Sequence, residues 1–189
     1  MKAHNIGAVS RAFDVIRVLQ KKEYATLDEV ASEFTCSKST VHRHLETLAN
    51  EGYVVRENGE YALSLLFLEH GELARNRNPH YELAAEKVNE LAEETAERAQ
   101  FIVEEQGRGV YAHRATGRKA VDVDTNLIRR VAIHDSAGAL LILPCFPTVR
   151  VAELQYNSRL DAITYQTITD DSALFDELER IRERGYSIK

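Results

Sequence analysis

The chain has no tryptophan, only two cysteines and no long apolar run, and each shortage excludes a class of protein. Cys36 and Cys145 lie far apart in the sequence, so a disulfide framework of the kind found in small secreted domains is not expected. A membrane-spanning helix needs about 20 consecutive apolar residues, and the sequence contains no such stretch. The N-terminal residues lack the apolar core of a signal peptide. We therefore expect a cytoplasmic protein without a membrane partner.

The sequence also lacks the short motifs of the common enzyme classes. It contains no glycine-rich phosphate loop, no nucleophile elbow and no zinc-hydrolase pattern. His42 and His44 lie near Cys36, but side chains two positions apart on a helix point about 200° apart and do not share one metal ion. Asp122 and Asp124 share one face of an expected strand, where exposed carboxylates need no catalytic role. We predict no catalytic residue, no metal site and no cofactor.

Between residues 26 and 61 the chain has local signals in the order helix, tight turn, basic helix and β-hairpin. Thr26 precedes Glu29 by three residues, which is the capping-box spacing of a helix start. Ser37 can cap a second helix, and Gly52 can end it. The apolar residues of the two helices recur at helical spacing, at Leu27, Val30, Ala31 and Phe34 and then at Val41, Leu45 and Leu48.

The second of these helices has a polar face that suits DNA. The chain carries no acidic residue from Phe34 through Leu45. At about 100° per residue, a set of polar side chains points away from the apolar stripe. These are Ser39, Arg43, Glu46 and Asn50, with His42 on the flank. Hydroxyl groups and a helix N-terminus suit phosphate oxygens, whereas an arginine can pair with guanine and a histidine can add a hydrogen bond.

A hairpin and a preceding helix complete the pattern. Asn58-Gly59 between β-prone residues is a strong hairpin signal, and residues 10–20 are amphipathic at helical spacing. A basic helix alone is more often a solvated surface, and such hairpins occur in many folds, but the order of the parts favours a winged helix-turn-helix. We expect DNA contacts from Thr26, Ser37, Lys38, Ser39, Thr40, His42, Arg43, Arg56 and Asn58.

The formal net charge of −6 is unusual for a protein that binds DNA. Most of the acidity lies in the later part of the chain, because residues 1–63 hold eight Lys and Arg against nine Asp and Glu. The number of neutralised phosphates sets the affinity for DNA and its salt dependence. A nearly neutral domain therefore has to rely on a local basic face and on two copies per site.

Residues 64–78 are rich in leucine, and we interpret them as a linker helix. The surplus of apolar area favours a dimer, because helix-turn-helix proteins usually read paired half-sites. In the alternative, these leucines pack under their own domain. Asn78 and Pro79 then provide a helix start, and we expect the long helix that follows to reach about Arg98.

From Ala99 onward the pattern changes from helical to alternating, as in antiparallel strands. The expected strands cover residues 101–103, 110–113, 121–124 and 131–133. Helical patterns follow at residues 135–143, where Pro144 ends the helix, and at residues 148–157. The sequence thus predicts an α+β protein, with an N-terminal winged helix-turn-helix and a second domain built on an antiparallel sheet.

Several segments resemble the IclR (isocitrate-lyase-regulator) family of prokaryotic transcription regulators. They are Ala8 to Ile16, Ser37 to Leu45, Leu48 to Val54, Tyr61 to Gly71 and Thr167 to Tyr186. The resemblance implies a GAF-like effector-binding domain with a pocket for a small organic acid or aromatic effector. The loop after the second strand, Thr116-Gly117-Arg118, would line part of this pocket, and the effector residues that the resemblance implies are Thr116, Gly117 and His134.

Two departures from the family pattern concern this pocket. Ala139 and Leu140 stand where the family often has Gly and Lys, and the chain ends at Lys189, where the next strand of the family begins. We therefore expect a C-terminally shortened effector domain with an incomplete sheet. A truncated regulator, a fragment and a natural short form are the open alternatives.

The sequence as a whole predicts a transcription regulator of the IclR type, with a DNA-binding domain over residues 1–63, a linker helix over 64–78 and an effector-binding domain over 79–189. It would bind double-stranded DNA as a homodimer or a dimer of dimers and respond to a small molecule. The alternative is a protein-interaction module built on a winged helix without effector response. Such a module would show no salt-dependent retention on duplex DNA.

Overall fold

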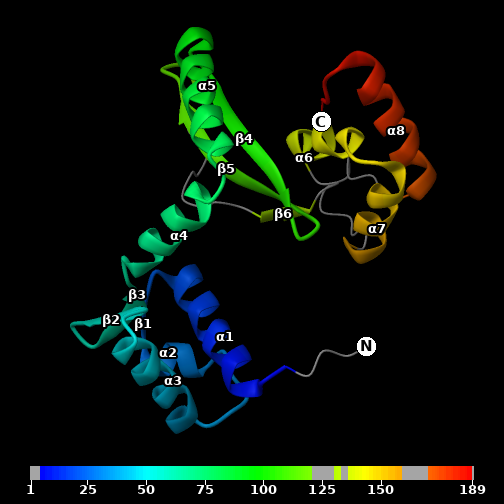
Figure 1. The fold of residues 1–189 in the computed structure, drawn as a ribbon. Helices are drawn as coiled ribbons and strands as arrows, with labels where there is room; N and C mark the ends of the chain where they lie inside the picture. The colour runs from blue at the N-terminus through cyan, green and yellow to red at the C-terminus, as the bar shows by residue number, and fades with distance from the viewer. Residues whose placement is uncertain (1–4, 121–129, 133–135, 159–169, 189) are drawn as a thin grey trace. The chain divides into compact units, whose positions relative to one another are not determined.

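The structure is a computed structural model that describes residues 5–120, 130–132, 136–158 and 170–188 (Figure 1). Side chains are described for all of these except residues 155–158 and 171. The chain divides into two compact units, of which the first ends at Arg77 and the second begins at Asn78. Each unit has its own buried apolar cluster, so each is described by itself.

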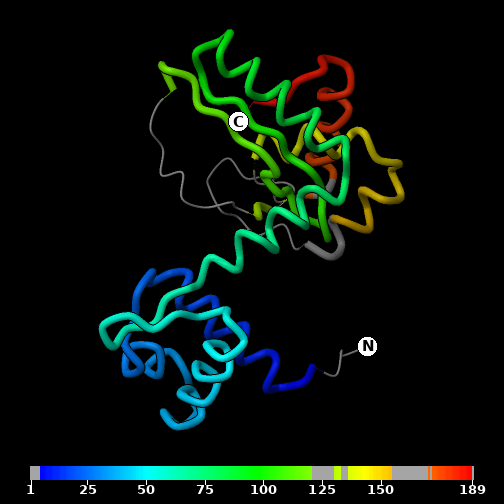
Figure 2. The backbone as a smooth tube through the Cα atoms, turned by 60° about the vertical axis from the view of Figure 1, so that its left-hand side comes forward, coloured from blue at the N-terminus to red at the C-terminus, as the bar shows by residue number. Residues whose placement is uncertain are grey.

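The first unit contains helices and a small antiparallel sheet that gather around one core (Figure 2). The helices are α1 (Gly7–Lys22), α2 (Leu27–Ala31), α3 (Lys38–Asn50) and α4 (Leu66–Asn76), and the strands are β1 (Tyr24–Thr26), β2 (Val54–Glu57) and β3 (Glu60–Leu63). The sheet has the order β1-β3-β2. The predicted helix-turn-helix and hairpin are therefore confirmed, whereas β1 was not predicted, because three residues are too few to show an alternating pattern.

The core of this unit is formed by the apolar stripes that the sequence pattern indicates. Val15 and Leu19 of α1, together with Val41 and Leu45 of α3, are almost fully inaccessible to solvent. Tyr61 of β3 closes the cluster as its largest buried side chain. Burying side chains of this size contributes about 1.5–3 kcal/mol each before the entropy cost of ordering them, so the stripe fixes which face of α3 points outward.

Local hydrogen bonds fix where the helices and the hairpin begin and turn. The Thr26 hydroxyl accepts from the Glu29 N–H at 3.3 Å, and the Glu29 carboxylate accepts from the Thr26 N–H at 2.7 Å, which confirms the capping box. Gly52 follows α3 with a positive φ of 81°. Asn58 and Gly59 both have positive φ values, of 52° and 89°, as a two-residue turn with the twist of the flanking strands requires.

Helix α4 contacts the winged helix through the aromatic ring of Tyr53. The Tyr53 ring meets Phe67 edge-on with the centroids 5.5 Å apart and stacks on His70 at 5.6 Å. The Tyr53 hydroxyl also lies 3.2 Å from His70 Nε2. None of the eleven residues of α4, all of which are described, is buried. Leu65, Leu68 and Leu73 are exposed, so these three do not pack under their own domain.

In its described residues, the second unit is a three-stranded antiparallel sheet with helices on its faces. Its elements are α5 (His80–Thr95), β4 (Arg98–Glu105), β5 (Arg108–Thr116), β6 (Arg130–Ala132), α6 (Ala137–Ile142), a 3-10 turn (Leu143–Cys145), α7 (Thr148–Ser158) and α8 (Asp171–Arg184). The strand order is β4-β5-β6, so the predicted antiparallel strands at 101–103, 110–113 and 131–133 are found, but β6 pairs directly with β5 rather than with a strand at 121–124. The expected strand at residues 121–124 lies outside the described residues, as does His134.

One boundary was predicted wrongly in this unit. Helix α5 ends at Thr95 rather than near Arg98, because Ala96 takes a left-handed conformation with a φ of 61°. Arg98 is instead the first residue of β4. An alanine gives no sequence signal for this conformation, which normally favours glycine or asparagine.

The sheet of the second unit is covered on both faces. Helix α5 lies along β4 and β5 (Figure 1), where Val88 and Ala92 pack with Ala99 and Phe101. On the other face α6 approaches so closely that a Cβ added at Gly138 would lie 2.4 Å from Cδ1 of Ile102. Helices α6, α7 and α8 and the 3-10 turn share an apolar cluster of Ala139, Leu140, Leu143, Val151, Leu154, Leu174, Leu178 and Ile181.

Candidate nucleic-acid interface and effector pocket

The first turns of α3 and Leu27 of α2 form a shallow, solvent-exposed surface, which we call the reading surface. Lys38, Ser39, His42 and Arg43, together with Leu27 of α2, line a hollow of about 670 Å³. Lys38, Ser39 and Arg43 are exposed, while Val41 and Leu45 are buried on the opposite side of the helix. The packing of α3 on α1 and α2 therefore presents the polar face that the sequence predicts.

The hydroxyl groups of the reading surface are already ordered by the helix cap. The Ser37 Oγ accepts from the Thr40 N–H at 3.3 Å, and it lies 2.9 Å from both Ser39 Oγ and Thr40 Oγ1. The structure thus brings these three predicted residues into one cluster at the N-terminus of α3. Thr26 does not join this cluster, because its hydroxyl bonds to Glu29.

The cations of this unit differ in how they are held. Lys38 forms an ion pair with Asp28 of α2, and the side chain of Arg43 makes no hydrogen bond or ion pair within the described part of the chain. On the hairpin, the Arg56 guanidinium lies over the Tyr61 ring, 5.5 Å from its centroid. The Arg43 guanidinium therefore has all five N–H donors available for a bidentate contact, such as one with the edge of a guanine.

Two acidic residues near these cations were not among the predicted site residues. The Glu46 Oε1 lies 3.5 Å from His42 Nε2, one helical turn earlier. Asp28 reaches Lys38 only because α2 packs against α3. The position of Glu46 on the polar face follows from helical periodicity, whereas the contact of Asp28 depends on tertiary packing and has no local signal.

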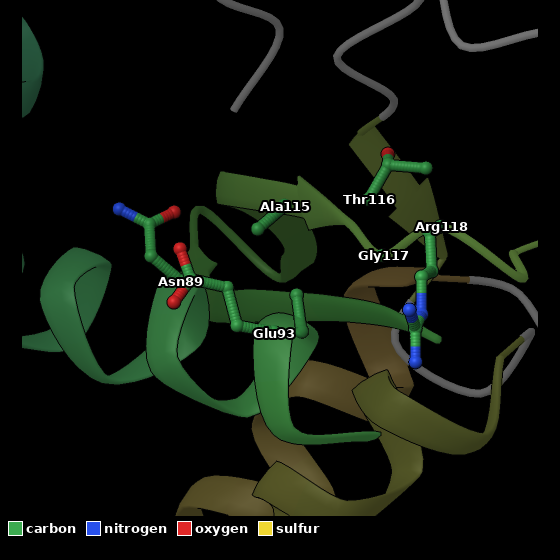
Figure 3. Close-up of a pocket in the computed structure, with 7 residues that line it drawn as sticks. Asn89, Glu93, Ala115, Thr116, Gly117 and Arg118 are labelled. Carbon is green, nitrogen blue, oxygen red and sulfur yellow. The ribbon is translucent and has the colours of Figure 1, made fainter. Parts of the chain in front are cut away.

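A second hollow, of about 580 Å³, lies between α5 and the end of β5 (Figure 3). Asn89 and Glu93 project from α5, Thr116 lies at the end of β5, and Gly117 and Arg118 follow in the next turn. Ala92 and Ala115 complete the lining. Two of the three predicted effector residues therefore line one hollow, together with Arg118 of the same predicted loop and with a carboxylate and an amide of α5 that the sequence did not single out. The Asn89 Oδ1 also lies 3.0 Å from His113 Nε2.

A glycine is required at position 117, because two backbone segments of the chain approach each other closely there. Its N–H donates to the Glu97 carbonyl at 2.9 Å, and the Lys119 N–H donates to the Ala96 carbonyl at 2.7 Å. A Cβ at position 117 would lie 2.3 Å from the carbonyl carbon of Ala96 and 2.5 Å from the Ala92 carbonyl oxygen. This glycine therefore joins the end of α5 to the end of β5 and fixes the floor of the hollow.

In residues 5–120 and the later described segments, no three His, Cys, Asp or Glu side chains gather as they would around a metal ion. No helix in the described part of the chain combines the length and the apolar character needed to cross a bilayer.

Comparison with known proteins identifies the family. The IclR helix-turn-helix domain matches residues 8–58, and the C-terminal domain of bacterial IclR transcriptional regulators matches residues 77–189. The chain belongs to the IclR family. It is thus an IclR-type DNA-binding transcription regulator, in a family of regulators rather than of enzymes. The comparisons fit this function and not the alternative of a winged helix used only for protein contacts.

Individual relatives extend over most of the chain. The probable HTH-type regulator ArcR of Halobacterium salinarum is 28% identical over 187 residues, which cover 97% of this chain and 71% of that protein. The HTH-type regulator KipR of Bacillus subtilis is 28% identical over 181 residues, covering 95% and 72%.

Solved structures share the fold. The IclR protein of Thermotoga maritima matches with a TM-score of 0.73 at 24% identity, over 97% of this chain and 75% of that one. An IclR regulator from Alicyclobacillus acidocaldarius matches with 0.77 at 23%, over 98% and 76%. An IclR homologue from Microbacterium hydrocarbonoxydans, complexed with 4-hydroxybenzoate, matches with 0.66 at 23%, over 94% and 73%. These likenesses confirm the predicted α+β architecture.

Proposed function

We propose that this IclR-family regulator reads an operator as a homodimer by inserting α3 into the major groove. The observation that carries the proposal is the reading surface, on which Arg43 is exposed and unengaged beside Lys38 and Ser39. The buried stripe of Val41 and Leu45 prevents α3 from turning this face inward. We propose that residues 1–63 bind DNA, that residues 64–78 link the two domains, and that residues 79–189 bind an effector.

The residues of the reading surface take different roles in this proposal. Arg43 pairs with a guanine edge, since a guanidinium matches the O6 and N7 acceptors. Lys38 and the hydroxyl groups of Ser39 and Thr40 contact phosphate oxygens, and His42 adds a hydrogen bond at the groove edge. Thr26 and Ser37 cap the two helix starts and turn them toward the DNA backbone. Thr26 can donate to a phosphate only by releasing its bond to the Glu29 carboxylate. From the hairpin, Arg56 and Asn58 reach an adjacent stretch of the duplex.

A dimer is supported by apolar side chains that stay exposed in the first unit. Ile6, at the N-cap of α1, and Val9 and Phe13 of α1 are exposed at helical spacing. Leu65, at the N-cap of α4, and Leu68 and Leu73 of α4 are exposed as well. Exposed apolar side chains that gather on one surface mark interaction sites. Because residues 1–63 hold one more acidic than basic residue, the second copy also supplies phosphate contacts that one copy lacks.

The hollow between α5 and β5 is the effector pocket that we propose. Arg118 offers a guanidinium for a carboxylate, while Thr116 and Asn89 offer hydrogen-bonding groups, which suits a small organic or aromatic acid. The 4-hydroxybenzoate complex of a homologue supports this ligand class. His134 is kept as a third effector residue. Control of DNA binding then requires that the acid bind one arrangement of the protein more tightly than another.

The experiment is to capture genomic DNA fragments with the purified protein, sequence them, and measure binding by fluorescence anisotropy across a salt series. Arg43→Ala should weaken binding to the captured sequence by about 1–3 kcal/mol and leave binding to random duplex nearly unchanged. Arg108→Ala, an exposed arginine of the second unit, is the charge-matched control and should change neither. Equal losses on captured and random DNA for Arg43→Ala would refute the reading role of α3.

A further inference from the structure

Glu46 is the only acidic residue of α3, and it lies on the face that points away from the core. With Ser39, Arg43 and Asn50 it forms the stripe i, i+4, i+7, i+11, opposite the buried Val41. Its side chain is 46% exposed. A carboxylate on a DNA-facing helix is repelled by every phosphate, so its presence there opposes binding that ignores sequence.

The contact of Glu46 with His42 does not account for this residue. The two side chains are 3.5 Å apart at i, i+4, and they are 44% and 46% exposed. Exposed pairs of this kind add little to stability, about 0.3–0.5 kcal/mol on a helix. The contact places the Glu46 carboxylate beside His42, one turn closer to the N-terminus of α3.

We propose that Glu46 is a specificity-determining residue that reads the amino group of a cytosine, with His42 as its positioning residue. An ionised carboxylate can only accept hydrogen bonds. In the major groove guanine and thymine present acceptors at the position where cytosine presents its N4 donor, so they repel Glu46. Adenine offers an amino group but places the N7 acceptor beside it, against the second carboxylate oxygen. Cytosine is therefore the base whose amino group the Glu46 carboxylate accepts without repulsion from an adjacent acceptor.

The spacing of Arg43 and Glu46 sets which bases they read relative to one another. Three residues advance a helix by about 4.5 Å, close to the rise of about 3.4 Å between stacked bases. Where α3 follows the groove, Arg43 and Glu46 therefore reach neighbouring base pairs, the first as a donor to guanine and the second as an acceptor from cytosine. The pair combines an attractive contact with a repulsive one, which discriminates better than either alone.

This inference rests on the operator reading proposed above, and the experiment separates the two. Binding sites are selected from a randomised duplex library with the full-length wild-type protein, Glu46→Gln, Glu46→Ala and Arg43→Ala, and affinities are then measured on single-base variants of the selected site. Glu51→Gln, just beyond the end of α3, removes the same charge and is the control. Circular dichroism confirms that each variant is folded.

We expect the wild type to prefer cytosine by about 10- to 100-fold next to the guanine that depends on Arg43. Glu46→Ala should lose this preference, keep the guanine preference and bind random duplex more tightly. Glu46→Gln should shift the preference to adenine, because an amide matches N6 and N7. His42→Ala should weaken the same cytosine preference, with an effect that is not additive with Glu46→Ala.

Two outcomes overturn the inference, and they differ. If Glu46→Ala and Glu46→Gln keep the wild-type base preferences while Arg43→Ala changes them, Glu46 is not a reader and the operator-reading proposal stands. If the wild type selects no sequence from the library, operator reading by α3 fails and the role of Glu46 fails with it.

Discussion

Lys38 Nζ is ion-paired with Asp28 Oδ1, so the first turn of α3 is tied to the first turn of α2 across the reading surface. The pair is open to solvent, with side-chain exposures of 54% for Lys38 and 78% for Asp28. A phosphate that approaches Lys38 has to displace the carboxylate and is itself repelled by it. The ion pair therefore lowers the affinity for any duplex while holding the lysine in place.

Replacing Asp28 by asparagine should tighten DNA binding. The change frees Lys38 and removes a negative charge near the phosphates, so we expect about a two- to fivefold gain at low salt, in line with the roughly 0.5–1 kcal/mol of an exposed pair. Fluorescence anisotropy on cognate and random duplex should show the same gain on both. Glu90→Gln removes a carboxylate from the exposed Lys87 pair on α5 and should leave the affinity unchanged.

Ser37→Ala should destabilise the first unit by about 1 kcal/mol, because the N-cap of α3 loses the oxygen that accepts from Thr40 N–H. Ser37→Gly should cost only a few tenths of that amount, since glycine leaves the helix end open to water. Urea unfolding of both variants followed by circular dichroism compares them. Equal stability of the alanine and wild-type proteins would contradict the role of the cap.

Acid should weaken the start of α2. The N–H of Thr26 bonds to the Glu29 carboxylate, with the Thr26 hydroxyl adding a second bond, and together they hold the pKa of Glu29 below its ordinary value of 4.5. The stabilisation is therefore complete above pH 4.5 and is lost as the pH falls through the folded-state pKa. Unfolding midpoints measured from neutral pH downward should fall less steeply for Glu29→Gln than for the wild type.

Gly117→Ala should destabilise the second unit. The added methyl group meets the backbone of Ala96 and Ala92, so the end of α5 has to move, at a cost of about 1–3 kcal/mol. Gly71→Ala is the matched control, because nothing lies within 4 Å of a Cβ at that position of α4. It should be neutral or stabilising by up to about 1 kcal/mol through better helix propensity. A thermal scan in which both variants melt like the wild type would rule out this close approach.

The parts of the fold that could be predicted from the sequence are those with local causes. The capping box at Thr26, the cap at Ser37 and the turn at Asn58 each depend on side chains within three residues of one another, so the sequence shows them directly. Strand β1 could not be predicted, because its three residues gain their structure from pairing with β3. The end of α5 could not be predicted either, since Ala96 is held in its left-handed conformation by tertiary contacts.

The residues of the candidate sites also divide into those with a local sequence signal and those that only tertiary packing reveals. The outward face of α3 follows from helical periodicity, and Arg43 was found on it correctly. The partner of Lys38 depends on how α2 packs against α3, which periodicity does not reveal. In the second unit, the family resemblance indicates the turn that contains Arg118, whereas only the folded chain shows that Asn89 of α5 lines the same hollow.

Helix α4 is exposed to solvent, so little packing within its own unit stabilises its helical structure. An isolated helix of fewer than about 12–15 residues is marginal in water, and α4 is held to its own unit chiefly through the Tyr53 ring. In the homodimer proposed here, a second copy would shield the leucines and favour the ordered form. Formation of this segment then becomes coupled to assembly, so the far-ultraviolet signal of the protein should strengthen as its concentration rises.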